Sequence, residues 1–179
     1  MWRKPTSIGA SIAVLTFTCM LSMPGHEAWA QQAAPWTSPP HIVVVSPNGA
    51  QVAKVRAAAA FWNRAVAALG ISFRLGSVSQ DARQYGSNSL ESERQPGRIV
   101  VLFANRTQRG GHAYRRTPTA GPLVYMRGDD SITVAHELGH TIGIPHSAGS
   151  DSVMRPGWHT LMLSGDDKAR LLALYSPRR

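Results

Sequence analysis

The stretch HELGHTIGIPHS, residues 136–147, decides the fold and the chemistry that the chain can have. His136 and His140 are four residues apart, so on a helix their imidazole rings project from the same face and can share one metal ion. Glu137 follows the first histidine but is rotated around the helix, so its carboxylate can reach a water molecule beside the metal rather than the metal itself. The spacing therefore predicts a metal site on a helix.

Two further residues complete a site with three histidines. Gly143 accepts a positive φ, so it can end the helix sharply and return the chain, which brings His146 to the same ion. Three neutral imidazoles leave the fourth position of a zinc ion open, as in catalytic rather than structural sites. Zinc lowers the pKa of water from about 15.7 towards 7, and a neighbouring carboxylate can take the proton during attack on a carbonyl group. The stretch therefore predicts amide hydrolysis.

The remaining elements predict an α+β fold. Short β-branched or alternating runs predict strands, which are HIVVVS from residue 41, ISFRL at 71–75, RIVVLFA at 98–104, a short GGHAY at 110–114 and GPLVYM at 121–126. The polar, aperiodic sequence from Ser77 to Gly97 predicts a long surface loop.

Three segments predict helices. Apolar residues at helical spacing run from Val52 to Leu69, and Gly70 is placed as a stop. A second helix is expected over residues 132–142, capped by Asp129, Asp130 or Ser131, and it carries the three-histidine motif. In the terminal LSGDDKARLLALY, Ser164 and Asp167 form a capping pattern ahead of a third helix.

Residues 1–30 have the pattern of an export signal. Arg3 and Lys4 come first, an apolar run spans about residues 8–23, and AWA ends at Ala30 as a small-x-small cleavage site. A membrane anchor is the alternative, but a run of about 16 residues is shorter than the roughly 20 that a spanning helix needs. We therefore expect a secreted or periplasmic protein whose mature chain has no membrane span.

Removal of this signal would change the thiol content and the charge. The only cysteine, Cys19, would leave with it, so the mature chain would contain no disulfide and no thiolate ligand. The formal charge of +9 would become about +8, with 17 Lys and Arg against 9 Asp and Glu. This charge favours anionic surfaces or acidic substrates, although a solvated basic surface is an equal alternative. No motif indicates a nucleic-acid partner. Residues 31–40 predict a flexible lead-in, and residues 41–179 suit a single domain.

The pattern of the three histidines, the glutamate and the glycine resembles that of the metzincin zinc peptidases, and three details resemble the matrixin branch, which includes the matrix metalloproteinases. Ser147 follows the third histidine, Met154 comes eight positions after that histidine, and the terminal helix begins with L-S-x-D-D. The resemblance implies a metzincin-type domain with a mixed, twisted sheet of about five strands, three helices, and an active-site cleft between N- and C-terminal subdomains.

The resemblance also implies roles for individual residues. It implies that Glu137 is the general base, that Met154 forms the floor beneath the metal, and that one zinc ion is bound by His136, His140 and His146. Pro156, Gly157 and Trp158 match the Pro-x-Tyr segment that walls the S1′ pocket of the family, which implies a bulky apolar P1′ residue. The edge strand that pairs with an extended substrate matches Gly111, His112, Ala113 and Tyr114.

The chain also departs from the family. His112 falls where matrixins place one ligand of a structural zinc, but the span from Arg98 to Arg127 has six arginines and no carboxylate, so neither that zinc nor the usual calcium sites are expected. The same arginines suggest a preference for acidic peptides. Without a propeptide cysteine, no cysteine switch is expected, and any restraint would come from a separate inhibitor.

We therefore expect a monomeric, secreted zinc endopeptidase that acts on a protein or peptide substrate. One alternative is a non-catalytic module that keeps the fold to bind peptides or polyanions. Glu137 discriminates between the two, since a module that only binds has no need for the base. A second alternative, a basic cell-envelope or polyanion-binding protein with a structural zinc, is disfavoured by the open three-histidine site.

Overall fold

The computed structural model describes residues 34–83, 93–103, 111–114, 117, 120–157 and 160–176. The predicted export signal, Cys19 and Trp158 lie outside these residues, as do the side chains of His112 and Tyr114. Among the described residues no helix combines the length and the apolar character that crossing a membrane requires.

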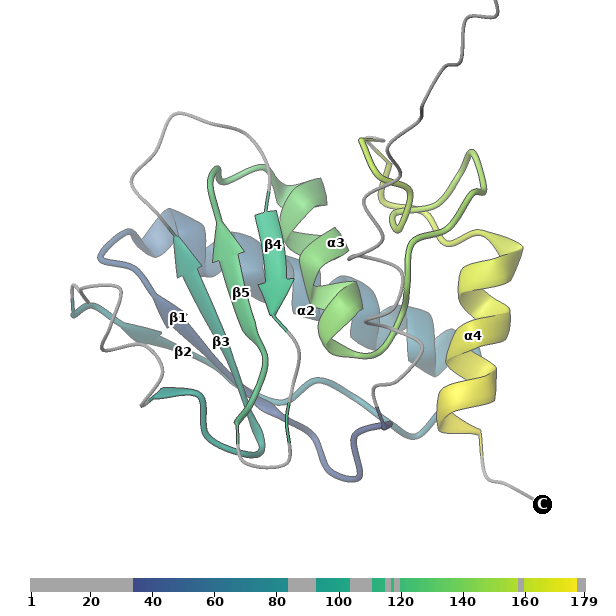
Figure 1. Cartoon of the computed structure of the whole chain (residues 1–179), viewed down its shortest axis with the longest axis horizontal. Helices are drawn as coiled ribbons and strands as arrows, with labels where there is room; N and C mark the ends of the chain where they lie inside the picture. Colours follow the sequence, from purple (N-terminus) through teal and green to yellow (C-terminus); the bar gives the residue numbers. More distant parts are fainter. Residues whose placement is uncertain are drawn as a thin grey trace, which may run out of the picture.

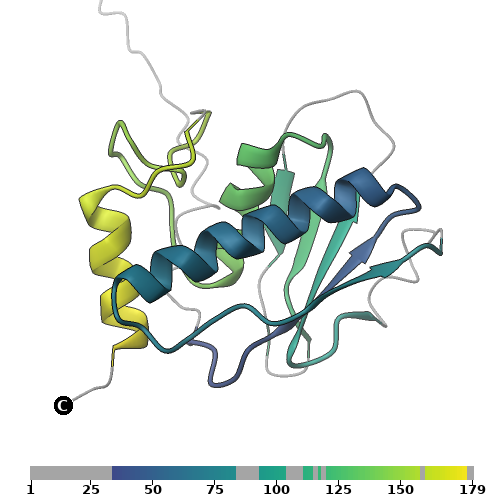
Figure 2. The ribbon, with the colours of Figure 1, turned by 180° about the vertical axis from the view of Figure 1, so that it is seen from behind.

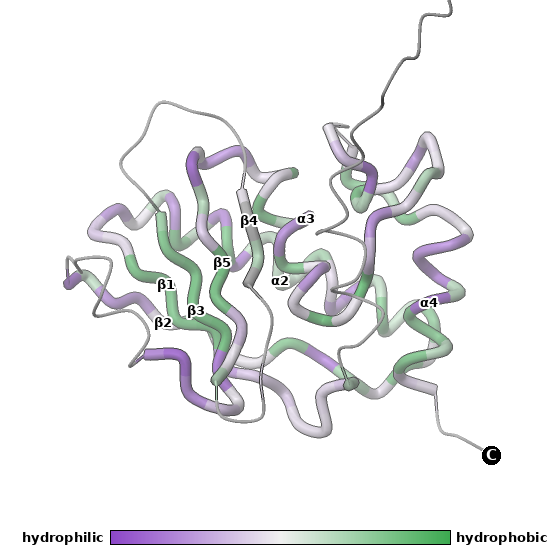
Figure 3. Tube along the Cα trace, viewed as in Figure 1, coloured by the Kyte–Doolittle hydropathy of each residue, from purple (hydrophilic) through white to green (hydrophobic). Residues whose placement is uncertain are grey.

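A mixed sheet of five strands forms one layer of the structure, in the order β2-β1-β3-β5-β4 (Figure 1). Four strands run parallel, and β4 is antiparallel to β5 at one edge. The strands are β1 His41–Val45, β2 Val78–Asp81, β3 Arg98–Phe103, β4 Gly111–Tyr114 and β5 Leu123–Met126. The hydrophobic β1, β3 and β5 occupy the centre of the sheet, as Figure 3 shows.

Three helices accompany the sheet in the described residues, namely α2 Gly49–Ala68, α3 Ser131–Thr141 and α4 Gly165–Tyr175. Helix α2 runs diagonally across one face of the sheet, with α3 beside it (Figure 2). Helix α4 lies beyond α3, on the side away from the sheet (Figure 1). The α+β architecture with a mixed five-stranded sheet and three helices is as expected, while the cleft between subdomains stays a prediction.

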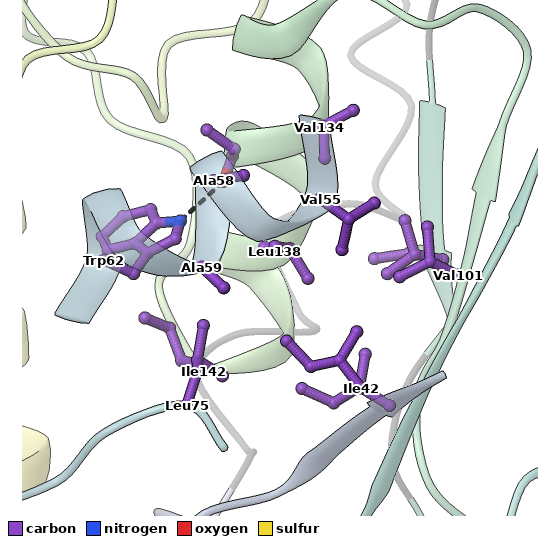
Figure 4. Close-up of a cluster of buried hydrophobic side chains, with 14 of the residues drawn as sticks. Ile42, Val55, Ala58, Ala59, Trp62, Leu75, Val101, Val134, Leu138 and Ile142 are labelled. Atoms are coloured by element: carbon purple, nitrogen blue, oxygen red, sulfur yellow. Dashed lines mark hydrogen bonds between the residues drawn. The ribbon is translucent and has the colours of Figure 1, made fainter. Parts of the chain in front are cut away.

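The main core lies between the sheet and these helices. Ile42 and Val101 point from the sheet towards Val55 of α2 and Leu138 of α3 (Figure 4), and all four are fully buried. Trp62 of α2 lies between the two helices, where its indole N–H donates to the carbonyl of Ala135 at 2.8 Å. This bond satisfies the only polar group of the buried Trp62 side chain and fixes α2 against the helix that carries the histidine motif.

The strand predicted at ISFRL is wrong. Residues 71–77 are extended but not part of the sheet, and the strand comes later, at β2, inside the predicted loop. The backbone of Leu75 is paired instead with the amide side chain of Asn63, which accepts from its N–H at 2.7 Å and donates to its carbonyl at 3.0 Å. Ile71 and Leu75 are buried in the core, so the alternating pattern reflects packing rather than strand pairing.

The segment before β1 is packed where it is described. Trp36 is only 8% exposed, and its indole N–H donates to the carbonyl of Thr141, 105 residues away, at 2.8 Å. Trp36 therefore anchors this segment to the core, while the flexible lead-in expected over residues 31–40 stays a prediction. A composition rich in proline and small residues disfavours helix and strand but does not prevent a single tryptophan from docking into the core.

Candidate metal centre

Helix α3 begins and ends where local chemistry requires. Asp130 is the N-cap, and its side chain accepts from the backbone N–H of Thr133 at 3.1 Å. At the other end Gly143 has a φ of +93°, and the N–H of Ile144 returns to the carbonyl of Gly139 at 3.1 Å. A glycine in this conformation ends a helix and reverses the chain, so the turn aims the following residues back at the helix.

The turn brings the three histidines together. One ring nitrogen from each of His136, His140 and His146 lies within 4.8 Å of the other two, and all three side chains are half-buried. The centroids of the rings are 4.8 to 5.3 Å apart. Residues spaced over eleven positions of sequence thus converge on one point, as the motif predicts.

Backbone carbonyls orient the two histidines of the helix. Nδ1 of His136 lies 2.7 Å from the carbonyl of Val153, and Nδ1 of His140 lies 2.8 Å from the carbonyl of Ile144. Because a carbonyl oxygen only accepts, each Nδ1 carries the hydrogen, which leaves the Nε2 lone pair for a metal. Burial lowers the pKa of His136, opposed by the Val153 carbonyl and by the charge of Asp167. The neutral form, which can bind a metal, is therefore favoured.

Glu137 lies between α3 and the edge strand. Its side chain is 6% exposed, and burial raises its pKa to about 7, opposed by a hydrogen bond from the backbone N–H of Ala113. Gly111 passes so closely that a Cβ atom there would lie 2.6 Å from Cγ of the glutamate. A carboxyl group with this pKa exchanges a proton readily near neutral pH.

Met154 packs beneath the same helix. It is fully buried, and its sulfur atom lies against Gly139, where a Cβ atom would overlap it. The N–H of Ser147 donates to the carbonyl of Met154 at 3.1 Å, which ties the residue after the third histidine to this turn. Met154 therefore packs against the metal-site helix, and its role as the floor beneath the metal stays a prediction.

Asp167 of α4 stabilises the turn that contains Met154. Its Oδ2 accepts from the hydroxyl of Ser152 at 2.7 Å, and Ser152 Oγ in turn accepts from the N–H of Met154 at 2.9 Å. The same carboxylate completes the predicted capping box with Ser164. The capping pattern predicted that Asp167 lies at the start of a helix, but no sequence signal indicated its hydrogen bond with Ser152, next to Met154 in the chain.

The substrate-binding residues predicted from the resemblance are only partly described. Gly111 and Ala113 of β4 contact the side chain of Glu137, whereas Pro156 and Gly157 are exposed in the turn that follows Met154. Trp158, and the side chains of His112 and Tyr114, lie outside the described residues. The structure therefore connects the edge strand to the site but not the predicted pocket wall.

The three histidines fit zinc. They offer three imidazole nitrogens, each a ligand that zinc takes in catalytic sites, and two of the histidines have the carbonyl partner at Nδ1 that zinc-binding histidines have. In the described residues no other group of three potential ligands is found.

Two histidines and a buried glutamate on one helix, a third histidine returned by a glycine turn, and an antiparallel edge strand beside the glutamate together match the pattern of the metzincin class. The chain belongs to the matrixin family, whose model matches residues 27–176. This family is a family of peptidases.

One curated protein is similar to this chain in sequence, and one solved structure is similar to it in fold. The chain is 32% identical over 101 residues to stromelysin-3 from Xenopus laevis, a match that covers 54% of this chain and 21% of that protein. Metalloproteinase-II from Bacteroides fragilis has the same fold, with a TM-score of 0.51 at 12% identity, over 82% of this chain and 55% of that one. The chain thus spans about one fifth of the curated relative and about half of the solved structure.

Proposed function

We propose that the chain is an exported zinc endopeptidase in which Glu137 is the general base. The observation that carries the proposal is the convergence of three histidine nitrogens within 4.8 Å, next to a buried glutamate on the same helix. The metallopeptidase domain is assigned to residues 41–179, and residues 1–30 are assigned to a removed export signal. One zinc ion per chain is expected.

His136, His140 and His146 would hold the zinc ion. When bound, zinc supplies the Lewis acidity that polarises a peptide carbonyl and makes water nucleophilic at neutral pH. Glu137 takes a proton from the attacking water as its oxygen bonds to the carbonyl carbon. The same carboxyl then delivers that proton to the amide nitrogen as the C–N bond breaks.

The edge strand is the proposed substrate platform. β4 is the edge strand of the sheet in the described residues, and we assign an extended peptide to its outer side, with backbone contacts from Gly111, His112, Ala113 and Tyr114. The direct contact of β4 with Glu137 supports this assignment, since a peptide paired with β4 would have its scissile bond near the base. Pro156, Gly157 and Trp158 are proposed to wall the pocket for an apolar P1′ side chain.

Replacing the base tests the proposal. Glu137→Gln keeps the size of the side chain and the three histidines, so the variant should bind zinc like wild type but lose hydrolysis of a denatured protein by about 10² to 10⁴-fold. A chelator should abolish wild-type cleavage, and metal analysis should give one zinc per chain. If zinc-loaded wild type cleaves nothing across a broad peptide library, the chain is a non-catalytic binding module instead.

A further inference from the structure

Two aromatic side chains meet the end of the metal-site helix from opposite ends of the described chain. Trp36, before β1, donates its indole N–H to the carbonyl of Thr141 at 2.8 Å. Tyr175, in the last turn of α4, donates its hydroxyl to the carbonyl of Ile142 at 2.9 Å. The two acceptors are consecutive residues at the point where α3 ends.

These carbonyls belong to the part of the helix end that the turn itself does not satisfy. The N–H of Gly143 returns to the carbonyl of His140, and that of Ile144 returns to Gly139. The next two carbonyls, of Thr141 and Ile142, accept from the aromatic side chains instead. Because Thr141 and Ile142 are buried, their carbonyls need such partners.

The turn held in this way carries two parts of the metal site. The carbonyl of Ile144 receives the Nδ1 hydrogen of His140 at 2.8 Å and so orients that ring. His146 lies two residues further along, so its position depends on the direction in which the chain leaves the turn. A shift of residues 142–144 would therefore turn one histidine and displace another.

We propose that Trp36 and Tyr175 are positioning residues, which clamp the turn after α3 and thereby set the zinc affinity of the site. Their rings also pack, since Tyr175 stacks on Phe73 with centroids 4.2 Å apart and Trp36 is in the main core. The hydrogen bonds add direction to this packing. The inference rests on the proposed zinc site but not on the proposed hydrolysis.

Substitutions that keep an aromatic ring but remove its hydrogen-bond donor distinguish the effect of the two hydrogen bonds from that of packing alone. Tyr175→Phe and Trp36→Phe leave an aromatic side chain in place, and Tyr125→Phe on β5 is the matched control. Zinc affinity is measured by competition with a chelator. We expect each clamp variant to raise the Kd for zinc about five- to tenfold, as loss of an indirect partner of the ligands should, with the control unchanged.

A second readout addresses the coordination itself. Cobalt in place of zinc gives visible absorption that depends on ligand number and geometry, so a shifted or weakened spectrum in the loaded variants supports the clamp even for a variant that unfolds without metal. Saturating zinc should restore hydrolysis with KM unchanged. General destabilisation would lower the melting temperature but would not alter the cobalt spectrum of the folded, loaded protein.

The outcomes decide the two proposals separately. Wild-type zinc affinity together with a wild-type cobalt spectrum in both clamp variants overturns the positioning role, whatever happens to hydrolysis. If wild type binds zinc but cleaves no peptide, the proposed function fails, and the affinity comparison still decides the clamp. A wild-type chain that binds no zinc overturns both.

Discussion

The sulfur of Met154 lies directly against Gly139, in the last turn of the helix that presents His136 and His140. Trp62 reaches the same point from α2, where its Cζ2 atom would be 2.6 Å from a Cβ atom on Gly139. Met154 and Trp62 can lie this close to the helix because residue 139 has no side chain.

Gly139→Ala should therefore destabilise the protein by about 1–3 kcal/mol, because the added methyl group overpacks a buried site. Urea unfolding of the zinc-free protein measures the change. Gly49→Ala is the matched control, since a Cβ atom there meets nothing within 4 Å and should not reduce stability. An equal stability of Gly139→Ala and wild type would contradict the close packing.

Ser152→Ala should cost about 1–3 kcal/mol, because it removes a donor to the fully buried carboxylate of Asp167 and an acceptor for the N–H of Met154. Chemical denaturation reports the loss. Ser150→Ala provides the comparison, as that hydroxyl bonds only to its exposed neighbour Asp151 among the described contacts. A loss of the same size in both variants would argue against the buried network.

Free zinc at 1,000 times its Kd should raise the free energy of unfolding of wild type by about 4 kcal/mol, because zinc binds only the folded site. Removing the metal should abolish this gain. Thermal melts with and without chelator give this difference. His146→Ala loses one of the three ligands, so its melting temperature should respond much less to chelator. An unchanged response would place the zinc elsewhere.

Asn63→Ala should cost about 1–3 kcal/mol by leaving both backbone groups of Leu75 without their side-chain partner. Denaturant unfolding measures it against Arg64→Ala, an exposed neighbour on the same helix that should have little effect. If residues 71–75 were a strand of the sheet, Asn63→Ala would lower the free energy of unfolding no more than Arg64→Ala.

Asn63 also shows why part of the fold could not be predicted. The helices, four of the five strands and the three-histidine cluster follow from local periods, caps and spacing, which the sequence displays directly. Residues 71–75 have the alternation of a strand, but the backbone of Leu75 pairs with Asn63, and the N–H of the next residue, Gly76, donates to the carbonyl of Pro40. Such pairing between a side chain and a distant backbone leaves no local pattern.

The same reason applies at the candidate site. The histidines, the glutamate and the methionine belong to one continuous stretch of sequence, so their spacing predicts their convergence. Trp36, Tyr175 and the link from Asp167 to Ser152 come from residues 15 to 105 positions away from their partners. Only the folded chain brings them to the helix, and the proline-rich composition around Trp36 gives no sign of its contact with Thr141.

The bond between Trp36 and Thr141, which spans 105 residues, has a consequence for the order of folding. Contacts that close long loops form late and slow the folding of a domain. Helix α3 can begin to form from its own sequence early, but its final turn waits for distant segments to arrive. We therefore expect the ability to capture metal to appear in the last kinetic phase of refolding, after most helical signal has returned.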